Sequence, residues 1–210
     1  MKPATSPEEL LEQLAEVGRT AVARGLVLAS GGNLSARLPG EDRFHVTRAG
    51  TWLDRLTVED FALLSLDGEV LEGSTPSSEW KLHARTYRVR PDVNAVVHLH
   101  PQHAVLVDAM GHRIRLVSLD HAYYVRSIGT VPYAPNGSDE LADTAAEQAR
   151  RHNCVVLSHH GCSALGPDVG MAFRRAMNLE EAATATYRML ACGDRRTAFP
   201  EEARAQLRHS

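Results

Sequence analysis

Two histidines separated by one residue stand at the end of a short apolar stretch, at positions 98 and 100 of the run 95–100. If this run forms a β-strand, its side chains alternate between two faces, so His98 and His100 project from the same face. Two imidazoles held in this way can bind one metal ion, and zinc in particular favours neutral imidazole nitrogen. Because a catalytic zinc site needs at least one further protein ligand, the pattern predicts that other ligands come from elsewhere in the chain.

Candidates for these further ligands accompany other predicted elements. The cluster Ser158-His159-His160-Gly161 directly follows a short apolar run, where it could supply a third imidazole. Glu79 lies in the predicted first turn of a helix, and one short turn joins that helix to the His98 strand. A glutamate there is either a ligand or general base beside the metal, or simply a residue favoured by the helix dipole. His83, one helical turn later, is a weaker competitor for the metal.

Two small-residue segments could bind an oxyanion such as phosphate. The turn 29–33 contains paired glycines, whose backbone amides can approach a bound group, and Ser30 and Asn33 add side-chain donors. Ser77 and Ser78 are cap candidates for the helix that follows them, and the free amides at a helix start attract anions. Paired glycines followed by asparagine are equally typical of an ordinary tight turn.

The composition limits the class of protein. The chain has 210 residues, 43% of them hydrophobic, which predicts one domain over 1–210 with a polar C-terminal tail at 195–210. A formal net charge of −3 argues against a nucleic-acid or anionic-membrane surface. Three widely separated cysteines fit a reducing compartment better than a disulfide framework. Because the chain shows neither a signal-peptide pattern nor a membrane-length apolar run, we expect a soluble, cytoplasmic protein without a membrane partner.

Capping signals and periodicity predict the elements that position these residues. Ser6, Pro7 and Glu9 form a capping box that begins an amphipathic helix. Asp67-Gly68 suits a type I′ turn and predicts a β-hairpin within a mainly β first third. The other predicted elements, each marked by apolar periodicity, are helices at 79–90, 101–111, 141–151 and 169–192 and strands at 95–100, 114–119 and 154–157.

Pro76-Ser77-Ser78-Glu79, the run 92–100 with its two histidines, and His159-His160-Gly161 occur in this order along the chain. Together these motifs resemble the class II aldolase/adducin family, especially its L-fuculose-1-phosphate aldolase branch. The resemblance implies a three-layer α/β/α fold with a central mixed, largely antiparallel sheet. It also implies an aldehyde-lyase that reversibly cleaves a ketose 1-phosphate, such as L-fuculose 1-phosphate, into dihydroxyacetone phosphate and an aldehyde. A zinc ion would stabilise the enediolate that cleavage leaves.

The resemblance assigns site roles by position. Zinc, or another divalent ion such as Mn²⁺ or Co²⁺, would be held by His98, His100 and His160, with Glu79 completing the shell or acting as the catalytic acid/base. The phosphate of the sugar would contact a set of small and polar residues, namely Ser30, Gly31, Asn33, Arg48, Gly50, Ser77 and Ser78.

One turn departs from the family pattern. Where the family has Thr-x-Ser/Thr-Gly, this chain has Thr47-Arg48-Ala49-Gly50, so the second hydroxyl is absent. Either Arg48 supplies a charge-assisted contact in its place, or the anion of the substrate is not a standard sugar phosphate.

A second acid/base and an oligomer are also implied by the resemblance. In fuculose-type relatives a tyrosine of a neighbouring subunit serves the aldehyde-side oxygen, which here suggests Tyr123 or Tyr124, with His121 as the alternative. Two adjacent tyrosines could instead be half-buried packing residues. We expect a cyclic homotetramer with its sites at the subunit interfaces.

Other functions share the scaffold. These are a sugar-phosphate dehydratase, a pentulose-phosphate epimerase and a 3-oxo-tetronate phosphate decarboxylase, and the segment 193–195 resembles the last group. An adducin-like binding module without enzymatic activity is the alternative from another class. That alternative predicts loss of the metal ligands, whereas His98, His100 and His160 are all present.

Overall fold

An eight-stranded sheet forms the centre of the molecule, whose computed structural model describes residues 2–207. Its strands are β1 (Asn33–Ala36), β2 (Arg43–Thr47), β3 (Phe61–Ser65), β4 (Val70–Glu72), β5 (Ala95–Leu99), β6 (Ile128–Val131), β7 (Cys154–Leu157) and β8 (Gly161–Gly166). They lie in the order β4-β3-β2-β1-β5-β8-β7-β6. All neighbouring strands are antiparallel except β6 and β7, which are parallel. The predicted mixed, largely antiparallel sheet is therefore confirmed.

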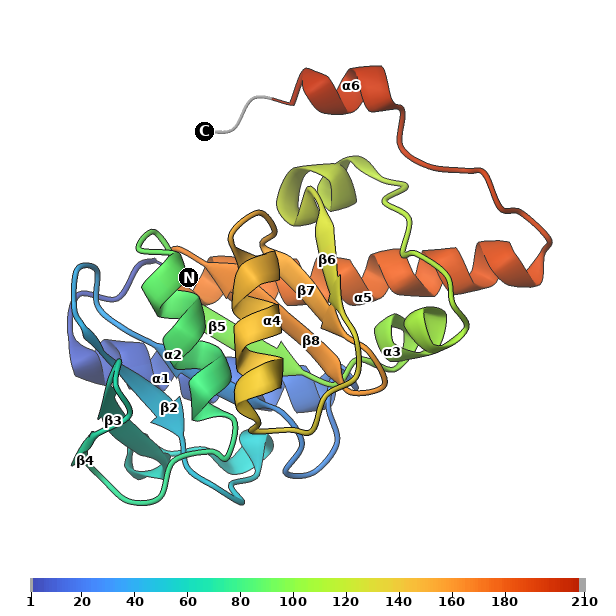
Figure 1. Cartoon of the computed structure of the whole chain (residues 1–210). Helices are drawn as coiled ribbons and strands as arrows, with labels where there is room; N and C mark the ends of the chain where they lie inside the picture. The colour runs from blue at the N-terminus through green and yellow to red at the C-terminus, as the bar shows by residue number, and fades with distance from the viewer. Residues whose placement is uncertain (1, 208–210) are drawn as a thin grey trace.

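Helices cover both faces of this sheet and complete the predicted α/β/α layers (Figure 1). The α-helices are α1 (Pro7–Ala23), α2 (Trp80–Val89), α3 (Gln102–Ala109), α4 (Asp139–Ala149), α5 (Val169–Ala191) and α6 (Glu201–Ala205). Shorter turns are the 3₁₀-helices η1 (Leu53–Arg55) and η2 (Val58–Asp60) and the π-helix η3 (His121–Val125). One core lies between the sheet and the helices α1 and α5, while two smaller cores lie under α2 and α4.

Strand β5 is buried along its whole length, yet its two faces meet different helices. Val97 and Leu99 belong to the core under α1 and α5, whereas Val96 belongs to the core under α2. Because side chains alternate along a strand, His98 lies on the α2 face with Val96. The strand thus aims the histidine toward the start of α2, where Glu79 lies.

The first helix begins where its capping signals predicted, with one change in the cap. Ser6 accepts a hydrogen bond from the Glu9 backbone amide at 3.3 Å. The Glu9 carboxylate accepts chiefly from the backbone and hydroxyl of Thr5, and the Ser6 amide makes a smaller contribution. A second capping box occurs at η2, between Thr57 and Asp60.

Two local predictions are wrong. The β3–β4 hairpin forms, but only Gly68 has positive φ in its turn, and Gly68 donates to the Ser65 carbonyl. This is a three-residue loop with glycine in the left-handed position, not a type I′ turn. Residues 114–119 form no strand. The Arg115 amide bonds Thr186 on α5, and Leu116 packs into the core with α5, so the apolar pattern of the segment is satisfied by a helix rather than by a sheet edge.

The polar tail after α5 runs back along this segment. The Phe199 amide donates to the Leu116 carbonyl at 2.7 Å, and Arg204 in α6 donates to the Arg126 carbonyl. Among residues 2–207, none of the helices has the length and apolar character needed to cross a membrane.

Candidate metal centre

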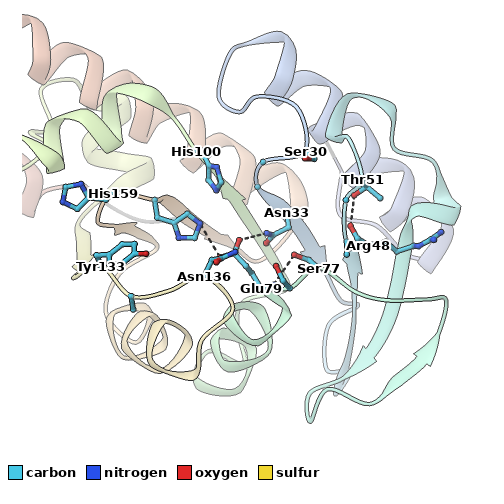
Figure 2. A pocket seen from close by; sticks show the side chains of 17 residues that line it. Ser30, Asn33, Arg48, Thr51, Ser77, Glu79, His100, Tyr133, Asn136 and His159 are labelled. Carbon is cyan, nitrogen blue, oxygen red and sulfur yellow. Dashed lines mark hydrogen bonds and ion pairs between the residues drawn. The ribbon is translucent and has the colours of Figure 1, made fainter.

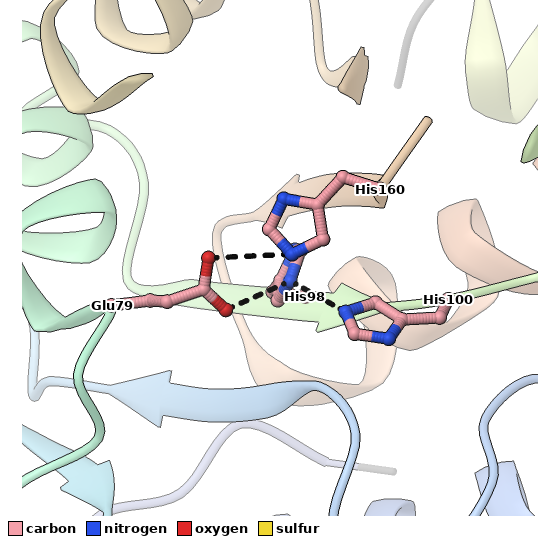
Figure 3. Close-up of side chains that lie close together, drawn as sticks. All are labelled: Glu79, His98, His100 and His160. Atoms are coloured by element: carbon pink, nitrogen blue, oxygen red, sulfur yellow. Dashed lines mark hydrogen bonds and ion pairs between the residues drawn. The ribbon is translucent and has the colours of Figure 1, made fainter. Parts of the chain in front are cut away.

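Three histidines and one glutamate converge at the end of β5 (Figure 3). His98 is the fourth residue of β5, His100 follows the strand, and His160 lies in the turn between β7 and β8. One ligand atom from each of these residues and from Glu79 lies within 4.8 Å of the other three. The predicted set of four ligand candidates is thus brought together from three separate parts of the chain.

The geometry inside the cluster fits a bound cation. His98 donates from Nδ1 to the Cys162 carbonyl at 3.0 Å, which leaves its Nε2 as the unprotonated nitrogen that faces the cluster. The Nε2 atoms of His98 and His100 lie 3.1 Å apart, and Glu79 Oε2 lies 3.2 Å from His98 Nε2. Glu79 Oε1, 3.4 Å from His160 Nε2, is buried and has no hydrogen-bond partner among the described residues. Converging lone pairs around an unpartnered carboxylate oxygen are what a divalent ion would satisfy.

The protonation states also suit metal binding. Burial alone would raise the pKa of Glu79, but His98, His160 and the Asn33 amide together hold it well below the usual range. Burial and the neighbouring histidines lower the pKa of His100 to about 3, and burial likewise lowers the pKa of His160. At neutral pH the carboxylate is therefore charged and these two imidazoles are neutral, which are the forms that bind metal.

Two glycines let the strands approach closely enough to form the cluster. A Cβ at Gly161 would lie 2.4 Å from the Leu99 carbonyl oxygen and 2.6 Å from the His100 ring. At Gly32, where φ is +70°, a Cβ would lie 2.6 Å from the His98 carbonyl oxygen. Real Cβ atoms do not approach so closely, so both positions require glycine for the histidines to keep their places.

Glu79 does not lie in the first turn of α2, as the sequence suggested. It is the N-cap residue, and its side chain makes no capping hydrogen bond. The Glu79 amide donates to Ser77 Oγ at 3.3 Å, so the serine serves the helix start. The carboxylate is directed at the histidines instead, so its position is set by His98 and His160 rather than by a cap.

A pocket of about 430 Å³ opens beside the cluster (Figure 2). The residues predicted to bind the phosphate all line it, namely Ser30, Gly31, Asn33, Arg48, Gly50, Ser77 and Ser78. Two of them contribute differently from the prediction. The Asn33 amide donates to Glu79 Oε2 at 2.9 Å, and the Arg48 guanidinium points away from the pocket and donates to the Glu59 carbonyl at 3.3 Å. The suggestion that Arg48 replaces the missing hydroxyl therefore finds no support in its position.

Three lining residues with polar side chains were not anticipated from the sequence: Thr51, Tyr133 and Asn136. Tyr133 is 64% exposed and its hydroxyl points into the pocket (Figure 2). All three lie in loops, where apolar periodicity gives no signal. His159, predicted only as the neighbour of a ligand, also lines the pocket, with positive φ.

The predicted second acid/base residues lie outside this pocket. His121 is buried and its Nε2 contacts Glu181 on α5. The rings of Tyr123 and Tyr124 contact each other edge to face with centroids 5.0 Å apart, and Arg174 lies over Tyr124. Within one copy of the chain, therefore, none of the three faces the metal cluster.

Comparison with known proteins gives the chain its relatives. Residues 12–187 match the family described as the class II aldolase and adducin N-terminal domain. The chain is 32% identical over 179 residues to an L-fuculose phosphate aldolase of Methanococcus maripaludis, covering 85% of this chain and 97% of that protein. It is 32% identical over 184 residues to a 5-deoxy-D-ribulose 1-phosphate aldolase of Bacillus thuringiensis, covering 87% and 86%.

Other similar proteins are named for reactions other than aldol cleavage. A 3-oxo-tetronate 4-phosphate decarboxylase of Haemophilus influenzae is 31% identical over 177 residues, covering 82% of this chain and 84% of that one. The crystal structure of YgbL from Klebsiella pneumoniae, described as an aldolase, epimerase or decarboxylase, superposes with a TM-score of 0.89 at 27% identity. That superposition covers 98% of this chain and all of the other.

Proposed function

We propose that this chain, which belongs to the class II aldolase and adducin family, is a metal-dependent aldolase for a ketose 1-phosphate. Like its relatives that are named aldolases, it is an aldehyde-lyase. The observation that carries this proposal is the convergence of three imidazoles and one carboxylate beside a pocket lined by small and hydroxyl-bearing residues. The proposed reaction is the reversible cleavage of a substrate such as L-fuculose 1-phosphate into dihydroxyacetone phosphate and an aldehyde.

His98, His100, His160 and Glu79 would hold the ion, and a donor set of three imidazoles and one carboxylate favours zinc, with Mn²⁺ or Co²⁺ as alternatives. A divalent cation bound there supplies Lewis-acid stabilisation of negative charge on oxygens of the substrate. The intact ligand set also argues against an adducin-like binding module, which has no use for such a cluster.

The phosphate would bind in the same pocket, beside the start of α2. Ser77 accepts from the Glu79 amide, so its own hydroxyl proton remains available for an anion. Ser78 and the backbone beside Gly31 and Gly50 line the same space. A helix N-terminus with such donors attracts phosphate, and this supports a phosphorylated substrate.

Glu79 would move the proton at carbon. In the cleavage direction the C3–C4 bond breaks, the C4 hydroxyl loses its proton to give the aldehyde, and the three-carbon fragment keeps the bonding electron pair. Glu79, which is ionised in the free site, would take up a proton from water and pass it to C3 to complete dihydroxyacetone phosphate, while the proton of the C4 hydroxyl is released to water by its acceptor. Because Glu79 Oε1 cannot hold the ion and a proton at once, this role requires that the carboxylate release the ion when substrate oxygens bind.

The group that accepts the C4 hydroxyl proton would come from a neighbouring copy in a cyclic homotetramer. His121 is buried against Glu181, which leaves Tyr123 and Tyr124 as the better candidates. This part of the proposal predicts that a variant at either tyrosine can be complemented by mixing with a variant in which only Glu79 is changed.

A decarboxylase acting on a 3-oxo-tetronate phosphate is the second candidate function. It is supported by the similarity to the Haemophilus decarboxylase and by the superposition on YgbL, whose description includes a decarboxylase. Both reactions break a carbon–carbon bond next to a carbonyl group, and in both the bonding electron pair stays on the fragment that carries this carbonyl.

One assay distinguishes the two functions. The zinc-loaded protein would be incubated with dihydroxyacetone phosphate and a panel of aldehydes, and separately with a 3-oxo acid phosphate. Formation of a ketose 1-phosphate supports the aldolase, whereas release of carbon dioxide without condensation would replace it with the decarboxylase. A protein inactive in both assays would contradict both proposals.

A further inference from the structure

Beneath the metal cluster, one face of α2 and one face of β1 are joined by buried polar side chains. Glu79, His83 and Tyr87 are spaced four residues apart, so they lie above one another on one face of the helix. Asn33 and Ser35 alternate with apolar residues on β1 and face the same side. Four residues of helix rise about 6 Å and two residues of strand rise about 6.6 Å, so the two rows stay in step.

Each member of the two rows is hydrogen-bonded to the next. The Tyr87 hydroxyl lies 2.7 Å from Ser35 Oγ, and Ser35 Oγ lies 2.6 Å from His83 Nδ1. On its other side, His83 Nε2 lies 2.5 Å from Asn33 Oδ1. Asn33 Nδ2 then donates to Glu79 Oε2 at 2.9 Å. All of these side chains are buried.

The carboxylate fixes the direction of every bond in this chain. Because Glu79 can only accept, the Asn33 amide must turn its NH₂ group toward it and its oxygen toward His83. His83 must therefore carry its proton on Nε2, and its Nδ1 must accept from the Ser35 hydroxyl. Since that proton of Ser35 is committed, Tyr87 must donate to Ser35. Both ring nitrogens of His83 are thus engaged, which removes it as a competing metal ligand.

We propose that Asn33, His83, Ser35 and Tyr87 are positioning residues that hold Glu79 Oε2 in place and thereby fix the orientation of the carboxylate toward the histidine cluster. This inference rests on the proposed role of Glu79 in catalysis. The hydrogen bond to Oε2 restrains rotation of the carboxylate, so Oε1 stays directed toward His160.

Neighbouring groups keep the row in the required protonation state. Burial and, to a smaller extent, His98 lower the pKa of His83 to about 3 against the opposing effect of Glu79, so His83 stays neutral. Burial raises the pKa of Tyr87, so its hydroxyl keeps the proton that it donates. Arg37 lies over the Tyr87 ring at 4.7 Å and donates to the Tyr87 carbonyl, which anchors the far end.

Kinetics of three variants test the positioning role. His83→Leu leaves the Asn33 oxygen without its donor, so the amide can rotate, and kcat should fall about tenfold or more with KM within twofold and metal content unchanged. His83→Gln retains a donor and an acceptor and should recover most of kcat. The control is Thr86→Val, which removes a buried hydroxyl on the same helix that bonds only to the Leu82 carbonyl. Equal kcat values for His83→Leu and Thr86→Val would overturn the proposal.

Nitrogen NMR of histidine-labelled protein tests the direction of the chain without metal or substrate, using the His83→Gln spectrum for assignment. The expected His83 signals are a protonated Nε2 and an unprotonated Nδ1, and Ser35→Ala should shift this balance toward the other tautomer. A protonated Nδ1 in the unmodified protein would contradict the proposal. Because this measurement needs no turnover, an absence of aldolase activity would contradict the proposed function while leaving the tautomer result intact.

Discussion

The two sides of the pocket are built in opposite ways. We call Glu79, His160 and Asn33, which line the pocket, together with the buried His98 of the cluster, the inner wall. We call Thr51, Tyr133, Asn136 and His159 the outer rim. Inner-wall side chains come from strands, a strand turn and a helix cap, and Glu79 is 5% exposed while His98 is 0% exposed. Outer-rim residues lie outside helices and strands, and Tyr133 is 64% exposed.

From this difference we expect the inner wall to carry out the reaction and the outer rim to determine which substrate is preferred. Each inner-wall side chain is fixed by neighbours, such as the Cys162 carbonyl for His98 and the Asn33 amide for Glu79. Changes there should alter turnover or metal binding by large factors. The outer rim has few such restraints and can vary with the substrate, so changes there should alter affinity and preference by small factors.

The largest expected effect is on the inner wall, at Glu79→Gln. The amide cannot exchange the proton at carbon, so we expect kcat to fall by about 10³-fold, within the range for loss of a general acid/base. The protein should still bind the metal through the three histidines. Steady-state kinetics with metal analysis would check this, with Glu147→Gln, an exposed carboxylate on α4, as the control. Full activity of Glu79→Gln would remove Glu79 from the mechanism.

The inner wall should also make the stability of the metal-free protein depend on pH. The pKa of His100 is lowered to about 3 in the folded chain, and that of His160 is also lowered, whereas both return to about 6.5 on unfolding. The unfolded state therefore takes up more protons below about pH 6.5, and the free energy of unfolding should fall as pH falls from there toward 3. The steepest slope would be about 1.4 kcal/mol per pH unit for each proton.

Urea denaturation in the presence of a chelator would measure that slope. His160→Gln, on the inner wall, should make this profile flatter than that of the unmodified protein. A His160→Gln profile as steep as that of the unmodified protein would show that His160 does not contribute to the slope.

A smaller effect is expected where the family hydroxyl is missing. Ala49→Thr would place a hydroxyl in the lining beside Gly50, and one added hydrogen bond is worth about 1 kcal/mol. The KM for a phosphorylated substrate should fall about fivefold with kcat nearly unchanged. If KM stays the same for the phosphorylated substrate, the phosphate does not bind at this turn.

The smallest effect is expected at Tyr133→Phe on the outer rim. Its exposed hydroxyl should change the relative kcat/KM for two aldehydes by about two- to threefold, because a solvated hydrogen bond contributes little. Competition between a polar and an apolar aldehyde would measure this ratio. If Tyr133→Phe lowered kcat as much as Glu79→Gln, Tyr133 would take part in catalysis like the residues of the inner wall.

The sequence predicted the parts of the site that follow the period of an element. His98 and His100 share a face because the side chains of a strand alternate, and the apolar pattern of β5 predicted this strand. His160 follows β7, whose apolar residues also predicted a buried strand. The sequence could not show that Glu79 is the N-cap of α2 and faces the histidines. The helix dipole favours a carboxylate near a helix start whether or not a metal is present, so the residue type alone does not distinguish the two roles.

Other features depend on tertiary contacts that periodicity does not encode. Residues 114–119 alternate like a strand but pack against α5, and Tyr133 reaches the pocket from a loop. The role of His83 was accessible in principle, since Glu79-x₃-His83-x₃-Tyr87 and Asn33-x-Ser35 have matching rises. Recognising it required knowing that β1 lies beside α2.

The most direct test compares two histidines that are neighbours in sequence but lie on different sides of the pocket. After loading with zinc and gel filtration, the metal content per chain would be measured for His160→Ala, for His159→Ala and for the unmodified protein. We predict one ion per chain in the unmodified protein and in His159→Ala, and almost none in His160→Ala. A His160→Ala protein that retains one ion per chain at unchanged affinity would contradict the metal centre, and the proposed catalysis with it.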